Sequence, residues 1–252
     1  MQNLIGFFRA ALVVTEVALG MILTILLSLV PVRIRGVRIA AWIPVWMSRI
    51  ALWICGIRVA LPDTPLLWRH KGLVFPNHLS YADIVVLMAT MPFRFLSNHG
   101  VRRIPFIGWT AVAIGTVFVN RRNVKSRADA RNDVLEQLIH QPFPPLIIFP
   151  EGKIYNGEYG QLHSFVPGAF RIAQEAQLPV IPLLIRYNHP EVMRWYSDSE
   201  SMYTAAWRLL RHTGDALTAT LHLLPARIVS PEETATASAQ TTQLEMEKAL
   251  QA

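Results

Sequence analysis

His78 and Asp83, five positions apart directly after the apolar run 72–76, are the residues whose types and spacing best suit chemistry. Five residues of a helix turn through about 140°, so the two side chains would diverge if both were helical. They can meet if His78 lies in the turn and the helix begins at Ser80, a good N-cap residue. The Asp83 carboxylate would then hold the Nδ1 proton of His78 and leave Nε2 free to act as a general base. The alternative is that Ser80 and Asp83 form only a capping box.

Two further groups of polar residues follow apolar runs. Glu151 lies in a tight Pro-Glu-Gly turn, followed by Lys153, after the run 146–149. Arg121 and Arg122 follow the run 116–120, and arginine binds phosphate through two parallel hydrogen bonds. Each group alone could be an ordinary turn or solvated surface. Because ligands bind at the carboxyl ends of strands in open α/β sheets, we expect these groups to surround one site with His78.

Short apolar runs alternate with helical patterns from residue 71 onward, which predicts an α/β domain with a mostly parallel central sheet flanked by helices. The expected strands are 72–76, 116–120, 146–149, 180–185 and 218–224, and the expected helices are 81–91, 124–140, 165–177 and 200–212. Ser230 followed by Pro231 and two acids predicts the start of a final helix.

The first sixty residues predict a membrane-associated two-helix hairpin. Residues 10–30 carry one charge, Glu16, and about 20 apolar residues span a bilayer core. The second stretch, 37–61, places Arg38 and Arg49 on one helical face, which suits a helix in the membrane interface or the return arm of a hairpin. A buried core helix is the alternative. We therefore divide the chain into a hairpin, 1–62, and an α/β domain, 63–252.

Composition narrows the class of partner. Of the 252 residues, 52% are hydrophobic and 16% charged, and the net charge is +7. A basic, apolar chain suits an anionic membrane, lipid or acidic substrate, and the absence of a basic tract with interleaved aromatics argues against nucleic acid. The one cysteine, Cys55, excludes an intrachain disulfide and is interpreted as a small buried residue.

Taken together, these groups resemble the glycerolipid acyltransferases of the lysophosphatidic acid acyltransferase (PlsC-like) type, from about residue 72 to 185. His78 and Asp83 match the family's catalytic His-x4-Asp block. The other matching positions are Gly108, Gly115 and Arg121 in the second block, Phe149–Gly152 in the third, residues 180–183 with Pro182 in the fourth, and a Phe-x-x-Gly at Phe165 and Gly168. Lys153 and Ile154 stand where the family commonly has Thr-Arg, and Asn98 stands where a lysine is common.

The resemblance implies a membrane-bound enzyme that moves a fatty acyl group from acyl-CoA or acyl carrier protein to the hydroxyl of a lysophospholipid. The acceptor expected first is 1-acyl-sn-glycerol-3-phosphate, which would give phosphatidic acid. His78 would be the base and Asp83 its orienting partner, while Arg121, Glu151, Gly152 and Lys153 would position the acceptor headgroup. No metal or other cofactor is expected, the active site would face the cytoplasm, and the oligomeric state stays open.

Three alternatives remain. The first is an acceptor such as a lyso-ornithine lipid or another lysophospholipid, because the residues after Gly152 depart from the family pattern. The second is a non-catalytic lipid-binding protein of the same fold. The third is a metal-dependent hydrolase, which would need further ligands at a suitable spacing beside His78 and Asp83.

Overall fold

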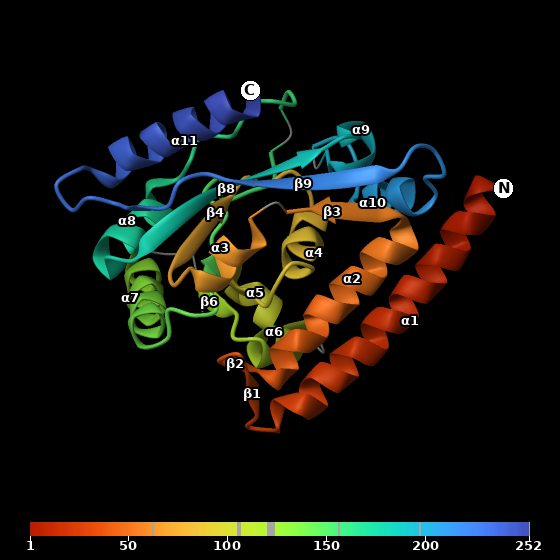
Figure 1. Cartoon of the computed structure of the whole chain (residues 1–252), viewed down its shortest axis with the longest axis horizontal. Helices are drawn as coiled ribbons and strands as arrows, with labels where there is room; N and C mark the ends of the chain where they lie inside the picture. The colour runs from red at the N-terminus through yellow and green to blue at the C-terminus, as the bar shows by residue number, and fades with distance from the viewer. Residues whose placement is uncertain (62, 105–106, 120–123, 156, 197, 252) are drawn as a thin grey trace.

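A computed structural model describes residues 1–61, 63–104, 107–119, 124–155, 157–196 and 198–251 of the chain. Within these residues, eight strands form a central sheet in the order β3-β9-β8-β4-β7-β5-β6, with β10 paired to β8 (Figure 1). The strands are β3 (Ile57–Ala60), β4 (Leu73–Pro76), β5 (Arg94–Asn98), β6 (Val117–Val119), β7 (Leu146–Ile147), β8 (Pro179–Tyr187), β9 (Leu217–Leu223) and β10 (Arg227–Ile228).

The sheet is mostly parallel. The neighbours β8, β4, β7, β5 and β6 all run in one direction, whereas β9 and β10 each pair with β8 in the antiparallel sense. β3 runs parallel to β9. The parallel strands therefore present their carboxyl ends along one edge, which is where the residues after β4 and β7 come together.

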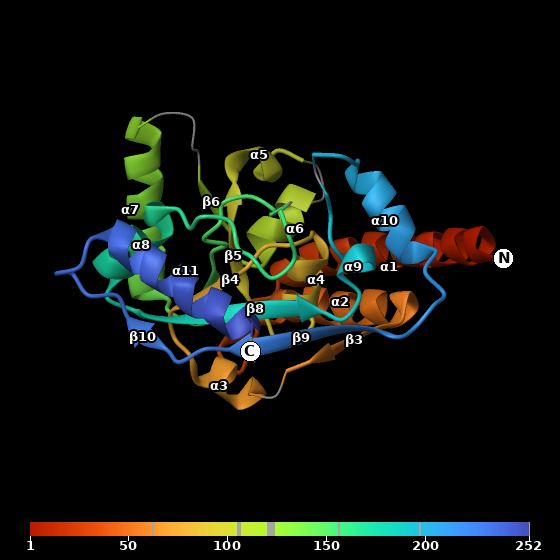
Figure 2. The same cartoon turned by 90° about the horizontal axis from the view of Figure 1, so that it is seen from above.

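Helices cover both faces of this sheet, and side chains of successive strand residues enter opposite cores. On β4, Val74 joins a core with α2 (Ile43–Cys55) and α4 (Ala82–Met88). Its neighbours Leu73 and Phe75 join a core with α7 (Val124–His140), α8 (Pro167–Ala176) and α11 (Ala235–Gln251). Figure 2 shows α11 beside α8, against which it packs. The predicted α/β class, with a mostly parallel sheet flanked by helices, is confirmed.

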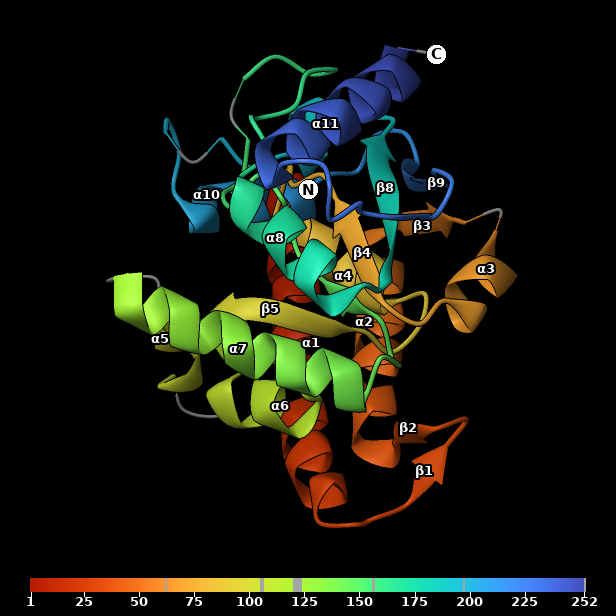
Figure 3. The same ribbon diagram turned by 90° about the vertical axis from the view of Figure 1, so that its left-hand side faces the viewer.

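The N-terminal helix α1 (Gln2–Ser28) lies alongside α2 and forms a helical hairpin on the side of the molecule opposite α11 (Figures 1 and 3). Within the described residues it is the one helix long and apolar enough to cross a membrane, and little of it is buried. The two helices approach closely at Gly20, where a Cβ atom would lie 2.3 Å from the Met47 Sδ. The hairpin also packs on the α/β domain, since Arg49 Nε donates to the Ala89 carbonyl at 2.8 Å.

Short elements connect these parts. They are β1 (Arg33–Ile34), β2 (Val37–Arg38), the 3-10 turn Ile39–Trp42, α3 (Thr64–Arg69), α5 (His99–Arg102), α6 (Ile107–Ala113), α9 (Pro190–Met193) and α10 (Met202–Leu210).

The second apolar stretch is not one continuous helix over 37–61. Arg38 lies in β2, before the helix, so it shares no helical face with Arg49. The helix ends at Cys55, because Gly56 adopts the left-handed conformation with φ +72°, and the next four residues form β3 of the sheet. Cys55 is buried, as expected. The division of the chain at residue 62 stays a prediction.

The start of the final helix was also predicted wrongly. The helix begins at Ala235, not after Ser230, whose hydroxyl accepts from the Glu232 N–H in a preceding turn. Thr234 supplies the cap instead, since its Oγ1 accepts from the Ala237 N–H at 3.1 Å. Both residues are good caps by type, so composition alone did not decide between them.

Candidate active site

The turn that carries His78 begins where β4 ends and is fixed to the neighbouring strand by Asn77. β4 pairs with β8 only as far as Leu183, and β8 continues to Tyr187. The Asn77 side chain takes the place of a longer β4, because its Oδ1 accepts from the Ile185 N–H at 2.7 Å and its Nδ2 donates to the Ile185 carbonyl at 3.2 Å. Buried backbone groups left unpaired would be costly, so this asparagine both completes the sheet edge and places the next residue.

His78 and Asp83 meet as the sequence predicts. His78 Nδ1 lies 2.8 Å from Asp83 Oδ2, and the carboxylate is completely buried. The same Oδ2 accepts from the backbone N–H groups of Leu79 at 2.7 Å and Ser80 at 2.8 Å. The helix begins at Ala82 rather than Ser80, so Asp83 is its second residue and reaches back over the turn. These N–H donors hold the carboxylate oxygen in place over the turn.

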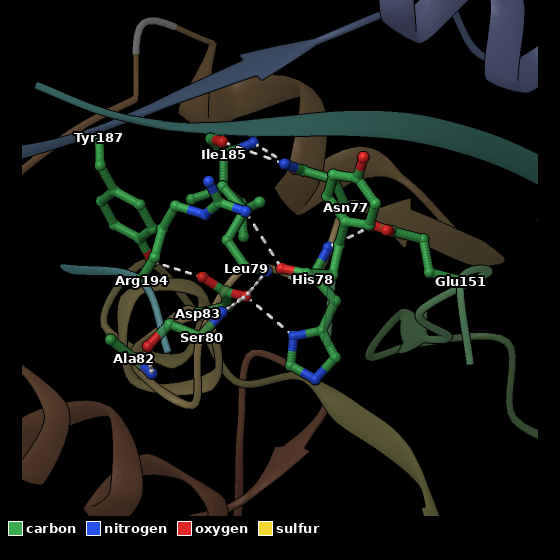
Figure 4. A network of polar contacts seen from close by, with 11 residues as sticks. Asn77, His78, Leu79, Ser80, Ala82, Asp83, Glu151, Ile185, Tyr187 and Arg194 are labelled. Atoms are coloured by element: carbon green, nitrogen blue, oxygen red, sulfur yellow. Dashed lines mark hydrogen bonds and ion pairs between the residues drawn. The ribbon is translucent and has the colours of Figure 1, made fainter. Parts of the chain in front are cut away.

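This geometry sets the proton on the imidazole. Because the Asp83 oxygen already accepts from two N–H groups, the His78 Nδ1 donates to it, and in the neutral ring Nε2 carries the free lone pair. Figure 4 shows Nε2 on the side of the ring away from Asp83. The ring stacks on Phe149, with centroids 3.9 Å apart. The imidazole is therefore held in one orientation with one nitrogen available as a base.

Glu151 holds the same turn from the opposite side. Its Oε1 accepts from the backbone N–H of His78 at 2.7 Å (Figure 4). Its Oε2 accepts from the backbone N–H of His163 at 2.9 Å. The side chain is only 2% exposed, and burial raises the pKa of Glu151 to about 8, against the opposing effect of these two hydrogen bonds. We expected Glu151 to position the acceptor headgroup. It does not line the cleft described below, and instead it joins two backbone segments of the site.

A cleft of about 440 Å³ opens in front of His78. Its polar lining includes Lys153 and Asp198, and Gly152 contributes backbone at a left-handed φ of +70°. Its apolar lining residues are Ile84, Phe95, Leu96, Ile148, Phe149 and Ile154. The structure therefore brings His78, Gly152 and Lys153 to one cleft. Arg121 lies outside the described residues.

A second, apolar cavity of about 240 Å³ adjoins this cleft between α1, α2, α4 and α10. Tyr81 and Trp195 line both spaces, and their rings stack with centroids 4.7 Å apart. A ligand whose hydroxyl lies at His78 would therefore find apolar side chains both in the cleft and in the cavity, on the two sides of the Tyr81–Trp195 pair.

Sequence reasoning missed Tyr187, which is part of the same network. Its hydroxyl donates to Asp83 Oδ1 at 2.5 Å from the last residue of β8 (Figure 4). The signal was available in principle, because this tyrosine ends an apolar strand at the same sheet edge. Trp195 was missed as well, and it follows no strand that would have pointed to it. Within the described residues, no group of three His, Cys, Asp or Glu side chains is placed to hold a metal ion.

Comparison with known proteins identifies the family. The model of the family described as Acyltransferase matches residues 58–186. A lyso-ornithine lipid O-acyltransferase of Pseudomonas aeruginosa is 33% identical over 86% of this chain and 81% of its own length. A 1-acyl-sn-glycerol-3-phosphate acyltransferase of Borreliella burgdorferi is 27% identical over 56% of this chain and 55% of that protein.

The fold has a solved counterpart. The crystal structure of the 1-acyl-sn-glycerophosphate acyltransferase PlsC from Thermotoga maritima covers 100% of this chain and 95% of that one, with a TM-score of 0.68 and 19% identity. Together with the extent of the family match, these similarities confirm the resemblance drawn from the His-x4-Asp and Phe-Pro-Glu-Gly blocks, and the chain belongs to the acyltransferase family.

Proposed function

We propose that this acyltransferase moves an acyl group from a thioester to the hydroxyl of a lysophospholipid, with 1-acyl-sn-glycerol-3-phosphate as the first acceptor to test. The observation that carries the proposal is the 2.8 Å contact between His78 Nδ1 and Asp83 Oδ2, which leaves Nε2 free at a cleft. A positioned base of this kind is what an alcohol needs in order to attack a thioester.

In the proposed step, His78 Nε2 takes the proton of the acceptor hydroxyl while the oxygen attacks the thioester carbonyl carbon. The new C–O bond forms, the C–S bond then breaks, and the departing thiolate receives the proton from the imidazolium. Asp83 stabilises the imidazolium between these two transfers. No covalent acyl-enzyme is required, and the acyl group passes directly from donor to acceptor.

The surroundings of the cleft suit a lipid acceptor and an acidic donor. The adjoining apolar cavity offers a place for a hydrocarbon chain beside the reacting groups. Acyl-CoA and acyl carrier protein are both anionic, in keeping with the net charge of +7. The exposed apolar surface of α1 supports membrane attachment, with the site on the cytoplasmic side because Arg33, Arg35 and Arg38 follow that helix.

A second acceptor class, a lyso-ornithine lipid, is favoured by the charges of the cleft. Apart from His78, its charged lining residues among the described part of the chain are one cation, Lys153, and one anion, Asp198. An ornithine headgroup that keeps one ammonium and one carboxylate matches this pair, and Trp195, which lines the same cleft, suits an ammonium. The Pseudomonas relative that carries this name also covers most of the chain.

The experiment is an acceptor panel. Membranes containing the wild-type protein or His78→Ala receive labelled acyl-CoA or acyl carrier protein with either lyso-lipid, and the acylated products are separated. We expect product with wild type and none with His78→Ala at equal expression. Equal product from His78→Ala would refute the function. If a lyso-ornithine lipid is the acceptor, Asp198→Asn should lower activity on that lipid more than on 1-acyl-sn-glycerol-3-phosphate. The exposed Asp215→Asn is the control and should leave both activities unchanged.

A further inference from the structure

The buried carboxylate of Asp83 depends on one residue outside the family's sequence blocks. Its Oδ2 accepts from the imidazole Nδ1–H of His78 and from the backbone N–H groups of Leu79 and Ser80. Its Oδ1 accepts from the Tyr187 hydroxyl at 2.5 Å, and no other described residue donates to that oxygen. Because Asp83 is completely buried, leaving Oδ1 without a donor would be costly.

We propose that Tyr187 is a positioning residue of the acyl transfer, acting through Asp83. The inference rests on the proposed role of His78 as the base. With Oδ1 held by Tyr187, the plane of the carboxylate is fixed and Oδ2 stays directed at the imidazole. The carboxylate in turn holds the imidazole so that Nε2 stays at the cleft.

Three features suit Tyr187 to this task. The side chain is 3% exposed, and burial together with the neighbouring carboxylate raises the pKa of Tyr187 well above its ordinary value, so its hydroxyl remains a donor. Its backbone is held from one side by β9, through its pairing with Ala219. On the other side, the Tyr159 hydroxyl accepts from the Tyr187 N–H at 3.1 Å and donates to its carbonyl at 3.0 Å. The hydroxyl is thus delivered from a fixed strand end.

Tyr187 does not line the cleft in front of His78, so its removal should change the chemical step and leave acceptor binding unchanged. A tyrosine that only filled the core would instead change stability, with no effect on the pH dependence of the rate. The two roles are therefore separable by measuring kcat, KM and the pH–rate profile together.

The test compares purified full-length wild type, Tyr187→Phe, His78→Ala and the exposed-residue control Tyr203→Phe. For Tyr187→Phe we expect kcat about tenfold lower, because a carboxylate without this contact no longer holds the imidazole in its reactive orientation, with acceptor KM unchanged. The acidic limb of the profile should move to higher pH, because a carboxylate without this donor holds the imidazolium more tightly. Tyr203→Phe should match wild type.

A replacement that keeps the hydroxyl gives a prediction of opposite sign. 3,5-Difluorotyrosine introduced at position 187 is a stronger donor and should move the acidic limb to lower pH. If neither replacement changes kcat or the profile while His78→Ala is inactive, the role of Tyr187 is refuted and the proposed function stands. If His78→Ala is fully active, the proposed function itself fails.

Discussion

Replacing Glu151 by glutamine tests whether this buried carboxyl supports the site as a neutral acid. Burial raises its pKa from 4.5 to about 8 in the folded protein. Between these two pH values the folded chain retains a proton that the unfolded chain releases. Raising the pH through this window therefore destabilises the fold, by about 1.4 kcal/mol for each pH unit.

The magnitude follows from that slope. From pH 5 to pH 8 the wild type should lose about 4 kcal/mol of unfolding free energy through this one group. Glutamine cannot ionise, so the variant lacks this loss. It does lose one hydrogen bond, because its amide NH2 must face either the His78 or the His163 N–H, at a cost of about 1–3 kcal/mol that does not depend on pH. The variant should be less stable than wild type at pH 5 and more stable at pH 8.

The assay is thermal unfolding followed by tryptophan fluorescence in detergent, at a fixed scan rate, from pH 5 to pH 8. The difference in Tm between Glu151→Gln and wild type should change by about 10 °C across this range and reverse its sign. The exposed Glu136→Gln is the matched control and should run parallel to wild type. Parallel curves for Glu151→Gln and wild type would refute the reasoning, since they would mean that Glu151 is ionised throughout.

Two other substitutions test how the cleft is built. Asn77→Ala leaves the Ile185 N–H and carbonyl without their side-chain partner, so we expect a loss of about 2–4 kcal/mol in unfolding free energy. Thermal unfolding should show a lower Tm, and an unchanged Tm would show that the sheet edge does not need this amide. Lys153 is the one Lys or Arg among the described residues that line the cleft. Lys153→Ala should therefore raise the acceptor KM several-fold and leave kcat unchanged in steady-state assays. A fall in kcat at constant KM would instead assign Lys153 to the chemical step.

The sequence allowed the polar residues at the strand ends to be predicted for a physical reason. Strands β4, β7 and β8 are buried on both faces and appear as continuous apolar runs, so the polar residues that follow them stand out. The contact between His78 and Asp83 also follows from local geometry, because both lie in one turn and the helix start after it.

Other features depend on partners distant in sequence. Strand β5 was not predicted, because it begins with the buried but charged Arg94 and so does not appear as an apolar run. Its guanidinium is accommodated because Nε donates to the Pro144 carbonyl at 2.9 Å. Tyr187 meets Asp83 across 104 positions, and Glu151 meets His78 across 73, so only the register of β4 against β8 and the course of the following loops bring them together. Local patterns carry no information on such contacts.

The most direct test of the account is the single-turnover rate of acyl transfer by purified His78→Ala, with and without added imidazole. We expect the rate to fall about 10³-fold, as loss of a general base does, while the substituted protein keeps its Tm. Imidazole in solution should restore part of the rate, because the cleft of about 440 Å³ that the missing ring faces can admit it. A wild-type rate in His78→Ala without imidazole would contradict the central claim.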